Sequence, residues 1–243
     1  MVLGLNNVVI FAGGIGSRMG SSLPKQFLKV DSKPIIIHTI EKFSQHKSID
    51  NIIVVCKEEY IELCRKMINK FNIKKVCAVI SGGATGQQSI YNGLNYLVNN
   101  ICAKDEDIVL IHDGVRPLIG EELISKSIEC VEKNGNSIAV SKAIETVIKI
   151  SIDGKIVETI DRSLCRNAKA PQCFYLKDIW RVHQLALRDG KKDSIDSATL
   201  MSSYGYTLHT IESASENIKI TTPNDYYMFK ALYVAKKEGK YYE

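Results

Sequence analysis

The sequence of 243 residues contains no hydrophobic run that approaches the ~18 residues needed to cross a membrane. It also lacks a basic N-terminal segment followed by a long apolar stretch, so no secretory signal peptide is visible. The seven cysteines form no Cys-x-x-Cys pair, and their odd number argues against a disulfide scaffold or a zinc site. These absences predict a soluble cytoplasmic protein whose cysteines are mostly small core residues in a reducing environment.

Aromatic residues make up only 7% of the chain, and lysines and arginines form no dense cluster with aromatics between them. The modest net charge of +5 favours anionic small molecules over nucleic acid as partners. Internal repeats, low-complexity tracts and linkers are absent too, while 45% hydrophobic residues is enough for a well-filled core. We therefore expect one domain over residues 1–243, with no nucleic-acid partner and no membrane partner.

The most informative segment lies near the N-terminus, where a short apolar run of strand type ends in a glycine-rich loop. Gly13, Gly14 and Gly16 permit turns at positive φ and let backbone N–H groups approach a ligand closely. Arg18 and Lys25 add positive charge beside this loop, which suits a triphosphate better than a neutral ligand. The segment is interpreted as the phosphate-binding end of a nucleotide enzyme, although the glycines alone would also fit a tight strand-to-helix turn.

Two widespread phosphate-binding motifs do not fit this loop. A Walker A motif requires Gly-x-x-x-x-Gly-Lys-Ser/Thr, and residues 14–20 offer no lysine at the required place. A dinucleotide fingerprint requires Gly-x-Gly-x-x-Gly, for which Gly20 is misplaced. A nicotinamide-dependent oxidoreductase is therefore disfavoured. A non-catalytic nucleotide-binding protein remains an alternative, which an assay of pyrophosphate release would separate from an enzyme.

Strand-like and helix-like segments alternate through the first 140 residues. Strands are predicted at residues 7–12, 51–56, 75–80, 107–112 and 137–140, and helices at residues 35–45, 58–70, 87–98 and 121–133. Near-continuous apolar strands between amphipathic helices indicate an α/β fold with a mostly parallel sheet covered on both faces. Ligands bind such sheets beyond the carboxyl ends of the strands, so we expect the glycine loop, the Gly82-Gly83 loop and Asp113 to meet at one edge.

The alternation stops after residue 142. Two β-branched runs, residues 145–150 and 155–160, flank an Asp153-Gly154 turn, which is a strong hairpin signal. Because a two-stranded ribbon is marginally stable alone, we expect it to project from the body and dock on a second subunit. Beyond the hairpin, the pattern predicts helices at residues 177–188 and 194–203, strands at residues 207–211 and 217–221, and a last helix capped by Thr222.

Asp113 is the candidate metal ligand. It follows a buried-looking apolar run near the glycine loop, and Mg²⁺ binds through one or two carboxylates together with phosphate oxygens. Asp113 could instead cap a turn and pair with Arg116, so the residues leave both interpretations open. His112 is interpreted as structural, because a substrate phosphate arrives already ionised and needs no base.

Four segments carry a family resemblance. They are residues 13–25, Ile111-His112-Asp113-Gly114-Val115-Arg116-Pro117, Ala170-Pro171-Gln172-Cys173-Phe174 and Glu216-Asn217-Ile218-Lys219-Ile220-Thr221. Together they resemble the CTP-dependent sugar-alcohol-phosphate cytidylyltransferases, a family that includes the methylerythritol 4-phosphate and ribitol 5-phosphate enzymes. The resemblance covers nearly the whole chain. It implies a Rossmann-like nucleotidyltransferase fold, Mg²⁺ dependence and a homodimer joined through a hairpin arm at about residues 143–166.

The resemblance also implies a role for each matching residue. The catalytic residues would be Arg18, Lys25, Arg162 and Lys219, with Lys219 neutralising the α-phosphate. Thr146 and Arg162 of the arm would bind the acceptor phosphate, in the active site of the neighbouring subunit. Contacts to the nucleotide would come from Ala12, Gly13, Gly14, Gly16, Gly82, Gly83, Ser89, Asp113 and Gly114, with Asp113 also holding the metal ion.

Three segments depart from the family pattern. Gly86 stands where an arginine is usual, Lys169-Ala170 where Gln-Thr is usual, and Leu164-Cys165 where methylerythritol enzymes often have Leu-Trp. Residues 23–27 and 33–43 look more like the ribitol branch. We therefore expect CMP transfer from CTP to ribitol 5-phosphate or a related polyol phosphate, with methylerythritol 4-phosphate as the alternative acceptor.

Overall fold

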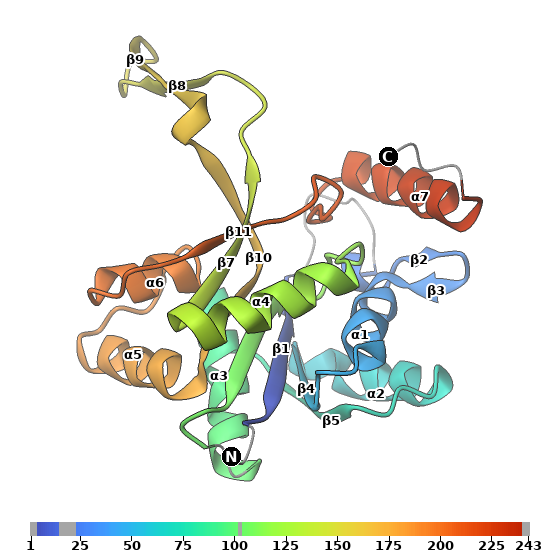
Figure 1. The fold of residues 1–243 in the computed structure, drawn as a ribbon. Coiled ribbons are helices and arrows are strands. Elements are labelled where there is room, and N and C mark those ends of the chain that lie inside the picture. The colour runs from blue at the N-terminus through green and yellow to red at the C-terminus, as the bar shows by residue number, and fades with distance from the viewer. Residues whose placement is uncertain (1–3, 15–22, 102–103, 240–243) are drawn as a thin grey trace.

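A seven-stranded sheet lies at the centre of the fold, in the order β11-β7-β10-β6-β1-β4-β5 (Figure 1). The computed structural model describes residues 4–14, 23–101 and 104–239, so the expected site residues Gly16 and Arg18 lie outside the described residues. Among the seven strands, only β10 runs antiparallel to its neighbours. The strands are β1 (Asn6–Ala12), β4 (Asn51–Cys56), β5 (Val76–Ser81), β6 (Ile108–Asp113), β7 (Asn136–Lys142), β10 (Arg166–Tyr175) and β11 (Thr210–Glu212).

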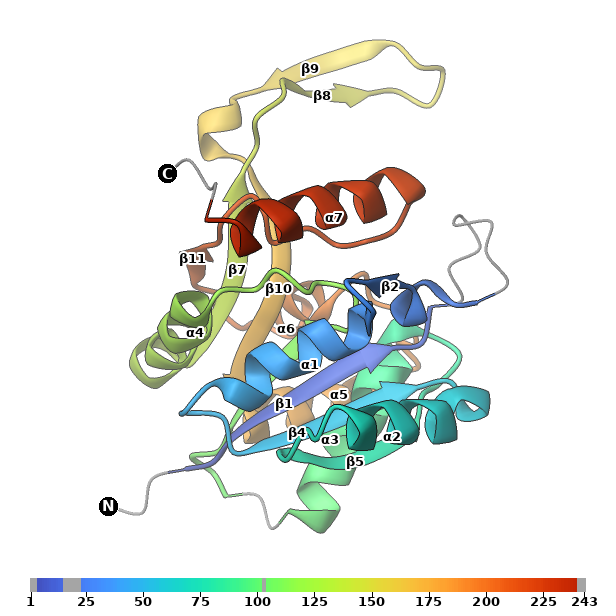
Figure 2. The same cartoon turned by 90° about the vertical axis from the view of Figure 1, so that its right-hand side faces the viewer.

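Helices cover both faces of this sheet because side chains alternate in direction along each strand (Figures 1 and 2). Val8 and Ile10 of β1 are buried in one apolar core, and Val9 between them is buried in another. The first core is closed by α1 (Ile35–Gln45), α2 (Ile61–Lys70) and α4 (Glu121–Asn134), and the second by α3 (Gly86–Asn100), α5 (Leu176–Arg188) and α6 (Ser197–Ser203). The expected mostly parallel α/β fold with helices on both faces is thereby confirmed.

The hairpin projects away from the sheet as an arm, as expected (Figures 1 and 2). Its strands β8 (Val147–Ile150) and β9 (Ile156–Ile160) pair antiparallel with each other and form a sheet of their own. The turn between them contains Gly154 at φ +81°, a backbone angle that glycine adopts without strain. Large apolar side chains of the arm are exposed in the single chain, among them Ile150 at 59% and Ile156 at 65%. Exposed apolar surface of this kind is typical of an interaction site.

The last helix, α7 (Pro223–Lys237), begins with the expected cap. Thr222 Oγ1 accepts a hydrogen bond from the Asp225 N–H, and the Asp225 carboxylate accepts one from the Thr222 N–H. Phe229 of α7 is fully buried and packs near Val115, in the loop after β6. The shorter elements are the strands β2 (Lys29–Val30) and β3 (Lys33–Pro34) and the 3-10 helices η2 (Lys25–Phe27), η3 (Glu58–Tyr60) and η4 (Arg162–Leu164).

The structure corrects two expectations about strands. The pattern predicts a strand at residues 217–221, but the structure has no strand there, and Ile220 N donates to Val115 O in a loop contact. The same pattern misses β10, which lies between β6 and β7. The register of β10 shifts between Ala168 and Gln172, around a cis Ala170–Pro171 bond. Pro171 is tolerated there because a bulge requires no ladder hydrogen bond from the missing N–H.

Two negative expectations can be compared with the described part of the chain. None of the helices in the described ranges is long and apolar enough to cross a membrane. The six cysteines in those ranges are all free thiols, and three of them, Cys56, Cys64 and Cys173, are buried. The described cysteines therefore form no disulfide.

Candidate active site

The carboxyl ends of β1 and β6 and the loop after β5 meet at one edge of the sheet, around a cavity of about 340 Å³. We call this cavity the loop cavity. Its lining includes the expected residues Ala12, Gly13, Gly14, Lys25, Gly83, Ser89, Asp113 and Lys219. The structure thus brings together residues that are widely separated along the chain.

Two expected glycines lie behind this lining, where the backbone segments pack closely. A Cβ atom at Gly82 would lie 2.8 Å from Ser89 Oγ, and one at Gly114 would lie 2.9 Å from Ala12 Cβ. A side chain at either position would push these neighbours apart. Both glycines therefore permit the close approach that shapes the edge of the loop cavity.

Lys25 is held beside the glycine loop by its neighbours. It belongs to η2 and is only 9% exposed. Next to it, Gln26 Nε2 donates to Ala12 O at 2.9 Å, which ties η2 to the end of β1. A Cβ atom at Gly14 would lie 4.0 Å from Lys25 Cε. The positive charge of Lys25 is therefore fixed at the loop cavity before any ligand binds.

Ser89 organises the second glycine loop. Its Oγ donates to Thr85 O at 2.9 Å and accepts from the Gly83 N–H at 3.1 Å. Thr85 Oγ1 in turn accepts from Gln88 N at 3.1 Å and caps the start of α3. These bonds hold the loop at residues 82–83 against a helix N-terminus, whose partial positive charge favours an anionic ligand.

Asp113 is the electrostatic centre of the site. Its Oδ2 accepts from Arg116 Nε at 2.7 Å, and its Oδ1 accepts from Lys219 Nζ at 2.7 Å. Burial would raise the pKa of Asp113, but the charges of Lys219 and Arg116 outweigh this effect and lower it. The pairing with Arg116 that the sequence left open is present, and Lys219 joins it. Asp113 is therefore an ionised carboxylate held between two cations.

Whether this carboxylate fits a metal ion can be judged from its surroundings. Asp113 is the one carboxylate among the described residues that line the loop cavity. The described ranges contain no cluster of three or more His, Cys, Asp or Glu that could cage a metal. Mg²⁺, however, often takes one or two carboxylates and completes its shell with phosphates and water. A carboxylate has about four acceptor sites, so Asp113 fits a Mg²⁺ ion that arrives with a nucleotide.

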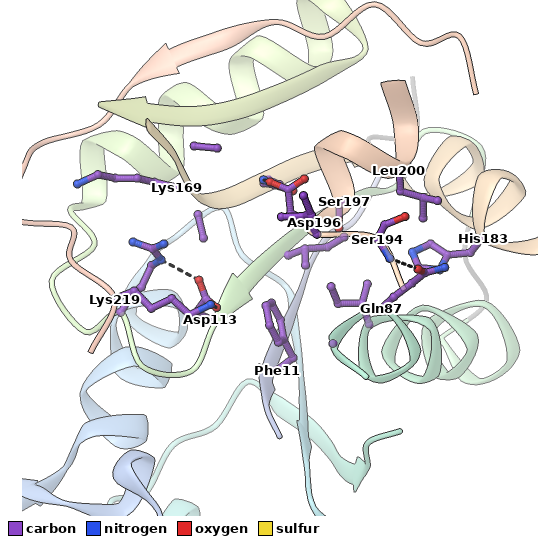
Figure 3. A pocket seen from close by; sticks show the side chains of 18 residues that line it. Phe11, Gln87, Asp113, Lys169, His183, Ser194, Asp196, Ser197, Leu200 and Lys219 are labelled. Carbon is purple, nitrogen blue, oxygen red and sulfur yellow. Dashed lines mark hydrogen bonds and ion pairs between the residues drawn. The ribbon is translucent and has the colours of Figure 1, made fainter. Parts of the chain in front are cut away.

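A second cavity of about 320 Å³ adjoins the loop cavity, and we call it the inner cavity. Phe11, Gly86, Asp113 and Lys219 line both cavities. In Figure 3, Asp113 and Lys219 lie on one side of the inner cavity, and Gln87 on the other. A Cβ atom at Gly86 would meet nothing within 4 Å, so the missing side chain leaves the space between the two cavities open.

Two buried glutamines that the sequence did not mark as site residues shape the inner cavity. Gln87 Nε2 donates to Lys191 O at 2.9 Å, and its Oε1 accepts from Ser194 N at 2.7 Å. Gln172 Nε2 donates to Asp196 Oδ2 at 2.8 Å, and its Oε1 accepts from Ala198 N at 2.9 Å. Together they fix residues 191–198 over the cavity. The available signal was that Gln172 lies inside a segment noted for the family resemblance, and that Gln87 directly follows Gly86, which departs from the family pattern.

Besides Gly82 and Gly114, three described residues singled out in the sequence do not line either cavity in the single chain. Thr146 and Arg162 belong to the arm segment, and Arg162 Nη1 donates to Ile144 O at 2.8 Å, within that segment. His112 is fully buried and its Nε2 lies 3.2 Å from Arg116 O. Burial lowers the pKa of His112 to about 4. His112 therefore packs behind the site as a neutral side chain.

Comparison with known proteins now identifies the family. The family model described as IspD, 2-C-methyl-D-erythritol 4-phosphate cytidylyltransferase, matches residues 6–234. This chain belongs to the IspD family. The family uses CTP, so the chain is a nucleotidyltransferase and the alternative of a non-catalytic nucleotide-binding protein is set aside.

Relatives in the IspD family are named for one of two acceptors, ribitol 5-phosphate or 2-C-methyl-D-erythritol 4-phosphate. A ribitol-5-phosphate cytidylyltransferase of Vibrio parahaemolyticus is 48% identical over 234 residues, which cover 94% of this chain and 95% of the relative. A 2-C-methyl-D-erythritol 4-phosphate cytidylyltransferase of Clostridium botulinum is 38% identical over 221 residues, covering 90% and 93%. The crystal structure of 4-diphosphocytidyl-2C-methyl-D-erythritol synthase from Anaerococcus prevotii superposes with a TM-score of 0.81 at 26% identity, covering 95% and 96%.

Proposed function

We propose that this enzyme transfers CMP from CTP to ribitol 5-phosphate and releases pyrophosphate and CDP-ribitol. The relative named for ribitol 5-phosphate is 48% identical to this chain, against 38% for the relative named for methylerythritol 4-phosphate. The structural observation that carries the proposal is the pair of adjoining cavities that share Asp113 and Lys219. The loop cavity suits a triphosphate, and the inner cavity suits an acceptor with several hydroxyl groups.

In the proposed reaction, an oxygen of the acceptor phosphate forms a bond to the α-phosphorus of CTP. The bond from that phosphorus to the bridging oxygen breaks, and pyrophosphate leaves with the electron pair. No general base is required, because the acceptor phosphate is already ionised at neutral pH. The reaction instead needs fixed positive charge around the phosphates, and Lys25 and Lys219 of the loop cavity supply it.

We further propose that catalysis depends on Mg²⁺. Bound Mg²⁺ supplies charge neutralisation on a triphosphate. Asp113 is the residue that would hold the ion. Asp113 also keeps Arg116 and Lys219 in place, since each donates to a different carboxylate oxygen.

The polar wall of the inner cavity supports the choice of a polyol acceptor. Gln87, Ser194, Asp196 and Ser197 line the cavity together with the shared Asp113. Hydroxyl groups of a polyol lose hydrogen bonds to water when they enter such a site, and these side chains offer replacements.

We also propose that the arm completes the active site of a second subunit in a cytoplasmic homodimer. In the single chain, Arg162 and Thr146 of the arm line neither cavity, while apolar side chains of the arm are exposed. Both observations support a partner that covers the arm and receives its polar residues. Arg162 offers a forked donor suited to a phosphate group.

The proposed activity can be tested by pyrophosphate release. CTP, ATP, UTP and GTP are each paired with ribitol 5-phosphate and with 2-C-methyl-D-erythritol 4-phosphate. We expect turnover with CTP and at least a ~10-fold higher kcat/KM for ribitol 5-phosphate, since small differences in a shaped pocket give discrimination of this order. A higher kcat/KM for methylerythritol 4-phosphate would overturn the acceptor assignment, and no release with any pair would overturn the proposed reaction.

A further inference from the structure

Lys169 of β10 lies between the inner cavity and the arm. It lines the inner cavity together with Arg116, and it also lines an open cavity of about 780 Å³ at the base of the arm. Among the described residues, no other residue lines both. Lys169 is absent from the lining of the loop cavity. Lys169 therefore lies where the inner cavity adjoins the cavity at the base of the arm, and in Figure 3 its side chain extends away from Gln87.

The ammonium group of Lys169 is held by main-chain oxygens. Its Nζ donates to Ser215 O at 3.0 Å and to Ala214 O at 3.4 Å. A lysine ammonium has three N–H donors, so these two bonds leave one donor for a ligand. Within the described ranges, no carboxylate forms an ion pair with Lys169, whereas Arg116 and Lys219 share Asp113.

This arrangement leaves positive charge uncompensated. Arg116, Lys169 and Lys219 line the inner cavity together with two carboxylates, Asp113 and Asp196, so its charged side chains carry a net charge of +1. Partial burial lowers the pKa of Lys169, the charge of Arg116 lowers it further, and the charge of Glu216 opposes this shift. An excess of positive charge at a partly buried site is unfavourable in the free protein, and a bound dianion relieves that cost.

We propose that Lys169 binds the phosphate group of the acceptor and so sets the affinity for the phosphorylated polyol, not the affinity for CTP. This inference rests on the cytidylyl transfer proposed above. It adds a cation from the enzyme's own β10 to the arm residues expected from the second subunit. The ligand chemistry is that of a phosphomonoester dianion, which a charge-assisted hydrogen bond from an ammonium group stabilises.

The competing role for Lys169 is structural. Its bonds to residues 214 and 215 could serve only to hold the segment that leads to Lys219. That segment, however, has other anchors. Asn217 Nδ2 donates to Ala170 O at 2.6 Å, and Arg116 Nη1 donates to Asn217 O at 2.9 Å. The segment is therefore held without Lys169, which leaves its charge available for a ligand.

The test compares Lys169→Met and Lys169→Arg with Lys142→Met as the matched control. Lys142 lines the open cavity at the base of the arm but not the inner cavity. Its Nζ lies 3.8 Å from Glu212 Oε1. Steady-state kinetics are measured with CTP and with the acceptor, ribitol 5-phosphate or 2-C-methyl-D-erythritol 4-phosphate, that the enzyme turns over. Loss of one charged hydrogen bond predicts a ~10- to 100-fold higher KM for the acceptor in Lys169→Met, with the KM for CTP and kcat nearly unchanged. Lys169→Arg and Lys142→Met should behave like the parent enzyme.

A binding experiment separates failure of this inference from failure of the proposed acceptor. Inorganic phosphate is titrated into full-length protein whose nucleotide site is filled by a non-hydrolysable CTP analogue. We expect the Kd for phosphate to rise about ten-fold in Lys169→Met and to stay constant in Lys142→Met, even if neither acceptor turns over. An unchanged Kd for phosphate, or a fall in kcat and Tm with an unchanged acceptor KM, would show a structural role and overturn the inference.

Discussion

Lys219 Nζ and Asp113 Oδ1 lie 2.7 Å apart at the boundary between the loop cavity and the inner cavity. The two side chains differ in exposure, with 44% for Lys219 and 8% for Asp113. Asp113 has a second cationic partner in Arg116, whose side chain is 10% exposed. Lys219 can therefore turn toward an incoming phosphate without leaving the buried carboxylate unpaired.

Lys219→Met should lower kcat by ~10²–10³, because removing one group that stabilises transition-state charge has an effect of this size. The Tm should change little, since Arg116 still pairs with Asp113. Lys177→Met is the control, because Lys177 is similarly exposed and lies 3.8 Å from Asp105. An unchanged kcat in Lys219→Met, measured by pyrophosphate release, would contradict the role of Lys219.

Lys25→Ala should lower kcat far more than it weakens CTP binding. Lys25 is fixed beside the glycine loop before ligand binds, so its charge acts mainly as the transition state develops. We expect a ~10²- to 10³-fold loss in kcat. The Kd for CTP, measured by calorimetry, should change by a much smaller factor. A raised Kd for CTP with an unchanged kcat would show that Lys25 binds the ground state alone.

Asp113→Asn should destabilise the fold as well as abolish turnover. The substitution leaves two cations without a carboxylate in a largely buried site, and breaking a buried ion pair costs about 3–5 kcal/mol. Urea denaturation measures the free energy of unfolding. Asp105→Asn is the matched control, because Asp105 is exposed and its pair with Lys177 should contribute less than ~1 kcal/mol. Equal stability of Asp113→Asn and the parent enzyme would argue against the buried pairing.

Arg162→Ala should raise the KM for the acceptor and leave the Kd for CTP unchanged, because Arg162 lies on the arm and does not line the loop cavity. Mixing this variant with Lys25→Ala protein, at acceptor concentrations below the raised KM, should restore part of the activity. A heterodimer would contain one active site with both residues intact. A monomer in solution, or no recovery when subunits demonstrably exchange, rules out a shared site.

His183→Phe should weaken the dependence of stability on acidic pH. His183 is 2% exposed, and its Nε2 has no hydrogen-bond partner among the described residues. Burial lowers the pKa of His183 from 6.5 to about 4. Between these values the unfolded chain binds a proton that the folded chain does not, so the free energy of unfolding falls as the pH drops, by up to ~1.4 kcal/mol per pH unit.

The measurement for His183→Phe is urea denaturation from pH 7 to pH 4.5. The slope of the free energy of unfolding against pH should be shallower in the variant than in the parent enzyme. It should not vanish, because burial also lowers the pKa of His112 to about 4. Identical slopes would mean that His183 is protonated in the folded state.

Hydrophobic periodicity was sufficient for most elements of the fold. The helix at residues 35–45 and the strand at residues 51–56 have the predicted bounds, because their apolar spacing is a local property of the chain. The periodicity could not reveal β10. Lys169 and Pro171 interrupt its apolar pattern, and its pairing partners β6 and β7 are elements formed earlier in the chain.

The sequence by itself determined which charged groups the site contains, since Lys25, Asp113 and Lys219 stand in segments with a specific family resemblance. Only the tertiary structure decided how these groups are paired. Lys219 reaches Asp113 because the loop before α7 packs over the end of β6. Lys169 lies at the inner cavity because the antiparallel strand β10 is inserted between β6 and β7. Local patterns set helices and strands, whereas strand order and long-range packing set which side chains face one another.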